Sequence, residues 1–396
     1  MNSWSKRIWI VSLLFVVAVL FPAEPDACSW DYVIWQKSKK SDTPLFRFVT
    51  KEWLAGYIDK DGKVVIPPKY RYWGNSGGDF FEGRAVVKNA KDGEIIDATG
   101  KKIADVDELR TGDFSEGMAT VIVERPKGRG FKAGFLGIDG KIAIPAQFDN
   151  VRSFSDGLAV AEINDLYGYI GRFGKFVIQP QFAKAWAFSE GFARVFSKAG
   201  CYYVTDGPCS DIVRLPGKLG LQLDNRLSFP RCEYSFVDRQ GQFLTDKTFK
   251  DAKDFSEGLA SVWNGELWGF IDTTGSLKIP FRFKDAEPFS EGLARVLVGD
   301  LWGYINASGQ FVIEPQFKFA GEFSEGLAVV GKFENNRHQY WFVNKAAKQA
   351  IPGLFDAASA FVMERAHVRV GRKESYIDRT GKAVFTYSLP GDDEEK

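Results

Sequence analysis

Few residues of this chain have the types and spacing that catalysis requires. Gly74, Ser76 and Gly78 match the Gly-x-Ser-x-Gly pattern, in which the serine is the nucleophile of a hydrolase. That chemistry also needs a nearby histidine and a strand–turn–helix setting. The chain has two histidines, His338 and His367, and both are distant in sequence. We therefore interpret this segment as a glycine-rich loop and predict that the protein is not an enzyme, with a hydrolase as the disfavoured alternative.

The four cysteines are the other reactive side chains. Cys201, Cys209 and Cys232 fall in one stretch, which predicts a local disulfide if the compartment is oxidising. Cys201 can pair with Cys209 or with Cys232, and the spacing does not choose between them. Neither the spacing nor the supply of histidines fits a zinc site. We predict no bound metal and no cofactor.

An acidic residue recurs once per repeat within the motif Phe-Ser-Glu-Gly. These carboxylates could form a ladder that binds Ca²⁺, or they could satisfy backbone donors at a tight turn. The glycine that follows each acid favours the turn. The acids are Glu82, Glu116, Asp156, Glu190, Glu257, Glu291 and Glu325.

The elements that carry these motifs repeat with a period of about 34 residues. A Gly-Tyr-Ile-Asp element begins at ten places, near residues 56, 94, 134, 168, 202, 235, 269, 303, 341 and 375. In one unit we expect strands at 293–298, 301–306 and 310–313, the last one ended by Pro315. Alternation puts Gly303 on the face opposite Trp302 and Tyr304, where the missing side chain lets a neighbouring group approach closely. Insertions concentrate at 124–130 and 331–338, which predicts one exposed connection.

The composition and the repeats predict an all-β protein. Aromatic residues make up 15% of the chain and there are 40 glycines. A single short unit buries too little apolar surface to fold alone, so the units must share a core. Ten units exceed the usual number of propeller blades. We therefore predict tandem β-hairpin units stacked as an elongated solenoid or superhelix, with a propeller-like closed ring as the alternative.

Two units contain a Trp-Gly dipeptide, Trp268-Gly269 and Trp302-Gly303, and Tyr167-Gly168 is a milder version. The units also share Ile-Asp, Gly-Lys, Ile-Pro and Phe-Ser-Glu-Gly-Leu-Ala pieces. In these features they resemble the WG repeat family, which is named for the Trp-Gly dipeptide. The resemblance covers about residues 50–390, although the unit at 202 lacks the Phe-Ser-Glu-Gly motif. It implies a β-repeat domain and brings no catalytic residues with it.

The ends of the chain predict its location. Lys6 and Arg7 precede an uncharged apolar run from 8 to 21, which is typical of an export signal and short for a membrane span. We predict a signal peptide at 1–27, a linker and N-terminal cap at 28–52, repeats at 53–390 and a disordered acidic tail at 391–396. Cys28 is a candidate for lipidation, although Pro25 departs from the lipoprotein motif. The expected locations are the periplasm, cell envelope or extracellular space, with no membrane span after cleavage and a possible lipid anchor.

These observations predict a bacterial binding or scaffold protein whose partner is a protein or an envelope glycan. The net charge of +1 does not favour nucleic acid. Most aromatic rings are expected to form the core, because short repeats have little else to bury. A cell-wall-binding module that uses aromatics between repeats is the alternative function, and a structural spacer is a third. The candidate ligand-binding residues, which depart from the strict pattern, are Trp73, Trp186, Trp263 and Trp341.

Overall fold

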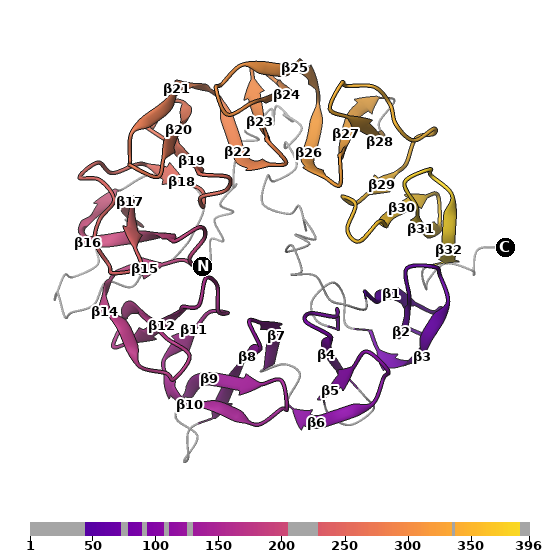
Figure 1. The fold of residues 1–396 in the computed structure, drawn as a ribbon, viewed down its shortest axis with the longest axis horizontal. Helices are drawn as coiled ribbons and strands as arrows, with labels where there is room; N and C mark the ends of the chain where they lie inside the picture. The colour runs from indigo at the N-terminus through magenta and orange to yellow at the C-terminus, as the bar shows by residue number, and fades with distance from the viewer. Residues whose placement is uncertain are drawn as a thin grey trace, which may run out of the picture. The chain divides into compact units, whose positions relative to one another are not determined.

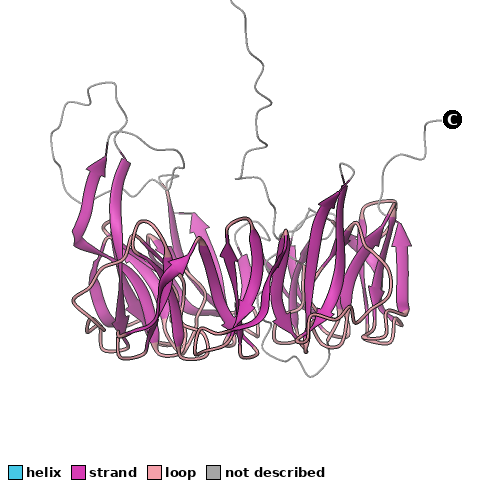
Figure 2. Ribbon diagram, turned by 90° about the horizontal axis from the view of Figure 1, so that it is seen from above, coloured by secondary structure: helices cyan, strands magenta, loops and turns pink. Residues whose placement is uncertain are grey.

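The computed structural model describes residues 44–72, 78–88, 93–106, 111–124, 130–204, 229–334 and 337–388. These residues form eight antiparallel sheets that follow one another around a ring (Figure 1). Seen from the side, the strands run between the two faces of the ring (Figure 2). No helix in these ranges is long and apolar enough to cross a membrane.

The first three sheets hold β1 to β14. The first has six strands and the next two have four each. Their strands are β1 (Phe46–Val49), β2 (Leu54–Ile58), β3 (Val64–Arg71), β4 (Arg84–Lys88), β5 (Gly93–Asp97), β6 (Lys102–Val106), β7 (Thr111–Ser115), β8 (Met118–Glu124), β9 (Phe131–Gly137), β10 (Ile142–Phe148), β11 (Asn150–Val151), β12 (Ala159–Ile163), β13 (Leu166–Ile170) and β14 (Phe176–Phe182).

The other five sheets hold β15 to β32, with three or four strands each. Their strands are β15 (Lys184–Ala185), β16 (Phe192–Val204), β17 (Phe229–Asp238), β18 (Asp251–Ala252), β19 (Leu259–Trp263), β20 (Trp268–Asp272), β21 (Leu277–Phe283), β22 (Asp285–Ser290), β23 (Leu293–Val298), β24 (Leu301–Ile305), β25 (Phe311–Phe317), β26 (Phe319–Ser324), β27 (Leu327–Glu334), β28 (Arg337–Asn344), β29 (Ala357–Ala358), β30 (Ala366–Val370), β31 (Lys373–Ile377) and β32 (Ala383–Ser388).

The sheet β22–β25 shows how one repeat forms four strands. β22 is the inner strand, and it ends in the Phe-Ser-Glu-Gly turn; β25 lies on the outside of the ring (Figure 1). The predicted strands at 293–298 and 301–306 correspond to β23 and β24. The prediction that Pro315 ends the third strand is wrong, because β25 continues to Phe317. A register shift between Trp302 and Tyr304 makes a bulge opposite, and a bulge accepts a proline that cannot donate to the ladder.

The predicted stacked solenoid is wrong, and the ring that was the alternative is correct. β1 of the first unit packs against β32 of the last: the rings of Phe48 and Phe385 lie 4.9 Å apart. The Tyr376 hydroxyl donates to the carbonyl of Arg47 at 2.7 Å. Arg365 also donates to the carbonyl of Lys60. The two terminal units therefore bury each other's apolar faces, which an open stack would leave in water.

The predicted count of ten units is also wrong. β16 extends through residue 202 to Val204 and pairs with β17, so the segment at 202 is the end of a long hairpin strand. Nine units remain, centred on β2, β5, β9, β13, β17, β20, β24, β28 and β31. The first two units share the six-stranded sheet, joined by the single pair Arg71 and Lys88. The ring is therefore an eight-sheet β-propeller built from nine repeats.

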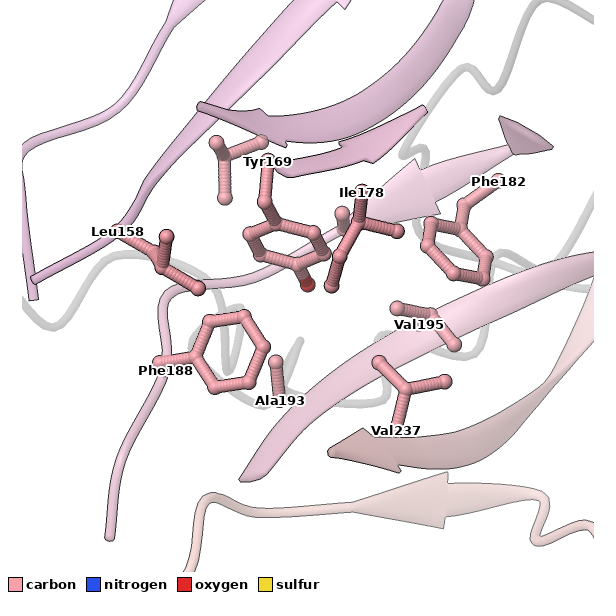
Figure 3. Packing of buried hydrophobic residues seen from close by; sticks show 10 residues of the cluster. Leu158, Tyr169, Ile178, Phe182, Phe188, Ala193, Val195 and Val237 are labelled. Atoms are coloured by element: carbon pink, nitrogen blue, oxygen red, sulfur yellow. The ribbon is translucent and has the colours of Figure 1, made fainter. Parts of the chain in front are cut away.

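The core lies between neighbouring sheets. In one such layer, Leu158 and Tyr169 pack against Phe188 and Val195 of the following sheet (Figure 3). Both faces of a sheet are buried in this way: Tyr304 belongs to one apolar layer and Ile305 to the layer on the other side. Alternating residues of one strand therefore join different layers, as the sequence predicted.

A belt of hydrogen bonds joins successive Phe-Ser-Glu-Gly turns. The carboxylate of each turn accepts backbone N–H groups of the next turn, at 2.6–3.1 Å, and we call this series the carboxylate belt. The turn interpretation of the acids is thus correct, although the satisfied donors belong to the following unit. The seven links run from Glu82 to Glu116 and Gly117, Glu116 to Gly157, Asp156 to Gly191, Glu190 to Glu257 and Gly258, Glu257 to Gly292, Glu291 to Gly326, and Glu325 to Glu364.

Candidate functional site

Three predicted ligand-binding tryptophans are half-buried between sheets. Trp186 lies 4.9 Å from Phe196, ring centre to ring centre, and Arg194 lies over its ring. Trp263 is the cross-strand partner of Trp268 and packs on the adjoining apolar layer. Trp341 packs on the layer beyond, 6.2 Å from Phe317. Trp73 lies outside the described residues. A ligand-binding role for these four residues stays a prediction.

The structure brings together a different aromatic group at the first unit. Trp53 lies in the hairpin between β1 and β2, and 52% of its surface is exposed. Its ring stacks on that of Tyr72, with centroids 5.8 Å apart and planes 20° apart. The Tyr72 N–H donates to the carbonyl of Trp53 at 2.9 Å, which ties the end of β3 to the hairpin. We call Trp53 and Tyr72 the aromatic platform.

The hairpin holds Trp53 in an unusual backbone conformation. Its φ is 59°, in the left-handed region that is uncommon for a bulky side chain. Two backbone hydrogen bonds close the turn, from Trp53 to Thr50 and from Thr50 to Leu54. Such strain persists only where the surroundings enforce it, and it often marks a functional position.

Charged side chains lie next to the aromatic platform. The Arg47 guanidinium lies 5.2 Å from the centre of the Tyr72 ring, and its Nε is 3.3 Å from Asp79 Oδ1. Burial raises the pKa of Asp79, and the charge of Arg47 only partly offsets that effect. Burial, together with the charge of Asp79, raises the pKa of the neighbouring Asp113 to about 6. The Tyr72 ring of the platform therefore packs against the Arg47 guanidinium, which forms an ion pair with Asp79.

The insertions predicted at one connection lie on hairpins equivalent to the one that carries Trp53. Residues 124–130 join β8 to β9, and residues 331–338 span the tip of the hairpin between β27 and β28. The β1–β2 hairpin joins the corresponding second and third strands of the first unit. Because strands alternate in direction, these hairpins all open on one face of the ring, opposite the carboxylate belt. The sequence variation and the platform thus share a face.

The ring contacts of the two histidines involve aromatic side chains and a carboxylate. His367 Nε2 lies 3.2 Å from Glu374 Oε2 and 3.1 Å from the Tyr387 hydroxyl. Burial and the charge of Arg369 lower the pKa of His367 to about 4, so the imidazole is neutral at pH 7. His338 lies between the rings of Phe333 and Tyr340. Ser76 lies outside the described residues, as do the predicted signal peptide, Cys28 and the acidic tail.

The described ranges contain no group of three or more His, Cys, Asp and Glu side chains that could hold a metal ion. The carboxylates of the Phe-Ser-Glu-Gly motifs are spaced one per unit and accept backbone N–H groups. Cys201 in β16 and Cys232 in β17 are direct partners in the strand register. Cys209 lies outside the described residues.

We expect a disulfide between Cys201 and Cys232 in the oxidised protein. Residues directly opposite in an antiparallel pair have Cα atoms roughly 4.5–5.5 Å apart, which is within the range of a disulfide. Mass mapping after thiol alkylation without a reductant should find this crosslink in the wild type and in Cys209→Ser. It should be lost in Cys201→Ser. If the wild type instead contains a Cys201–Cys209 crosslink that is absent from Cys209→Ser, then Cys209 is the partner of Cys201.

The ring and its repeats define the class of protein. Six segments match the WG-containing repeat, at residues 56–91, 134–167, 167–197, 234–266, 268–302 and 302–332. The chain therefore belongs to the WG repeat family, as the sequence resemblance predicted. Among curated proteins, none matches this chain.

Several solved structures are similar to this chain. A eukaryotic initiation factor is 13% identical, with 88% of this chain and 96% of that one covered and a TM-score of 0.58. Dipeptidyl peptidase 4 of Porphyromonas gingivalis is 9% identical, over 77% of this chain and 58% of that one, with a TM-score of 0.49. A prolyl endopeptidase is 12% identical, over 68% and 48%, with a TM-score of 0.37. At these identities the likeness concerns the fold alone.

The prediction that the protein is not an enzyme is contradicted by this comparison. It rested on the lack of residues with the types and spacing that catalysis requires. Peptidases are among the solved structures that match, and the prediction is therefore not kept. The likeness does not by itself assign catalysis to this chain.

Proposed function

We propose that the protein is an exported binding protein of the cell envelope that holds a glycan on the aromatic platform. The observation that carries the proposal is the exposure of Trp53. The described ranges hold six tryptophans, and Trp53 is the one whose side chain is exposed rather than packed between sheets. The basic start and apolar run of the N-terminus support export.

The platform has the chemistry of a sugar-binding surface. The face of an indole ring carries partial negative charge, and it attracts the C–H groups on the face of a sugar ring. Tyr72 and the closed turn hold Trp53 in place, so little side-chain freedom is lost when a ligand binds. Lys51, Glu52 and Arg71 are exposed nearby and offer hydrogen-bonding groups for hydroxyl or carboxylate substituents.

A second candidate function, the binding of a protein, is supported by an apolar area on the outer wall. Phe173 is 92% exposed, and Val177 in β14 is exposed beside it in sequence. Ile138 and Ile142 are exposed on the preceding unit. The two units are in contact here, because the turn at Gly174 lies against Ile144 of that unit. Exposed apolar side chains on adjacent units are typical of protein contacts.

Co-sedimentation of residues 28–396 with purified sacculi separates the two functions. We expect retention on protease-treated sacculi, and at least a tenfold loss in Trp53→Ala, equivalent to about 1.4 kcal/mol. Phe333→Ala removes an exposed aromatic from an equivalent hairpin and should retain binding. Full retention of Trp53→Ala would contradict the glycan proposal. Retention that requires untreated sacculi and is lost in Phe173→Asp would favour the protein partner.

A further inference from the structure

Among the described residues, one turn of the carboxylate belt donates no hydrogen bond to a carboxylate. Glu82 and Gly83 have φ values of 51° and 73°, close to the 54° and 78° of Glu116 and Gly117 in the next turn. The backbone N–H groups are therefore presented in the same way. Seven other turns place such N–H groups on a carboxylate of the preceding turn. No acceptor among residues of the described ranges lies on the N–H groups of Glu82 and Gly83.

The sequence of the first unit explains why its own repeat position supplies no carboxylate to this turn. Arg47 opposes Tyr57 as Arg295 opposes Tyr304, which sets the alignment of the two units. In this alignment Thr43 and Pro44 correspond in sequence to Glu291 and Gly292. Threonine carries no carboxylate, and proline has a fixed negative φ that excludes the left-handed turn. The first unit therefore lacks the acid that its repeat position would supply.

The guanidinium of Arg84 and the first described residues of the chain lie close to the N–H groups of Glu82 and Gly83. Arg84 Nη1 donates to the Gly83 carbonyl at 3.0 Å, so a guanidinium stands at the turn. Leu45 packs on the same apolar cluster as Phe80, which places the start of the described chain close to the turn. Asp42 precedes Leu45 by three residues, a reach of roughly 10 Å for extended chain.

We propose that the Glu82–Gly83 turn is a carboxylate-binding site. The same backbone turn binds a carboxylate seven times elsewhere in this ring, and an aspartate is long enough, because Asp156 reaches Gly191 at 2.9 Å. The carboxylate comes either from Asp42 of the same chain or from an acidic ligand in solution. Tethering gives Asp42 a high effective concentration, so it is the first source to test.

Amide hydrogen exchange of Gly83, measured by NMR on the whole mature chain, tests the site. Gly117, whose N–H is held by Glu82, is the internal reference. If Asp42 fills the site, Gly83 exchanges about as slowly as Gly117 in the wild type and at least tenfold faster in Asp42→Asn. Asp392→Asn, which removes an acid from the tail, should leave both rates unchanged. An unchanged Gly117 rate in each variant shows that the ring is folded.

The remaining outcomes identify the source or overturn the proposal. Fast exchange of Gly83 in the wild type that is slowed by sodium acetate, and unaffected by equal sodium chloride, supports a carboxylate from solution. Fast exchange that acetate does not change overturns the proposal. Slow exchange that persists in Asp42→Asn, in a buffer without carboxylates, also overturns it, since another group then covers the turn.

Discussion

Replacing Gly303 with alanine should lower the free energy of unfolding by roughly 3 kcal/mol. A Cβ at this position would lie 2.7 Å from the carbonyl oxygen of Ile313 and 2.7 Å from the nitrogen of Pro315. Both atoms belong to the backbone of β25 and cannot turn away as a flexible side chain would. The bulge that accommodates Pro315 brings this backbone close, and Gly134, Gly168 and Gly269 meet the same approach in other units.

Urea denaturation followed by circular dichroism and tryptophan fluorescence would measure the effect. Gly171→Ala is a matched control, because its Cβ would meet only Val177 Cγ2 at an ordinary 3.5 Å. We expect that variant to be neutral or slightly stabilising, since alanine restricts the unfolded chain. A loss below about 1 kcal/mol in Gly303→Ala would mean that β25 can move outward without breaking its ladder.

Removal of one carboxylate from the belt should also destabilise the ring. Glu82 accepts the N–H groups of Glu116 and Gly117 at 2.8 and 2.6 Å. Its replacement by alanine leaves two partly buried donors without a partner and should cost roughly 2–3 kcal/mol. Because the bonds join different units, the loss weakens the contact between the first sheet and the next.

The thermal midpoint and the exchange rate of the Gly117 amide would both report the change. Glu322→Ala is the control, because Glu322 is exposed just before a Phe-Ser-Glu-Gly motif and does not take part in the belt. We expect that variant to keep the wild-type midpoint and a protected Gly117. Equal midpoints for the two variants would contradict a stabilising role for the belt.

Much of the local structure could be predicted from the sequence because it depends on near neighbours. The alternation of Trp302, Gly303, Tyr304 and Ile305 specified a strand with two different faces, and the turn between Val298 and Leu301 fixed its hairpin. The glycine of the motif indicated a close approach, which the backbone of β25 makes. In each case the deciding contacts lie within one repeat.

The candidate site could not be found in this way. Trp53 stood at the boundary between the predicted linker at 28–52 and the repeats at 53–390, and it was not among the candidate ligand-binding residues. The platform also includes Tyr72, which follows β3, and Arg47 of β1 lies over the Tyr72 ring. The conspicuous Trp186 and Trp263 face neighbouring sheets and are half-buried there. Exposure is a property of packing between units, and a spacing rule does not contain it.

The sequence by itself determined that this is an all-β chain of WG repeats, because the turn residues recur in each repeat with the same spacing. Only the tertiary structure decided that the copies close into a ring. Closure depends on the small rotation between adjacent sheets, which accumulates over nine units until Phe48 meets Phe385. It also depends on where a repeat truly ends, and the continuation of β16 through residue 202 removed one apparent unit. Such rotations arise from packing between side chains of different units, and a single repeat does not encode their sum.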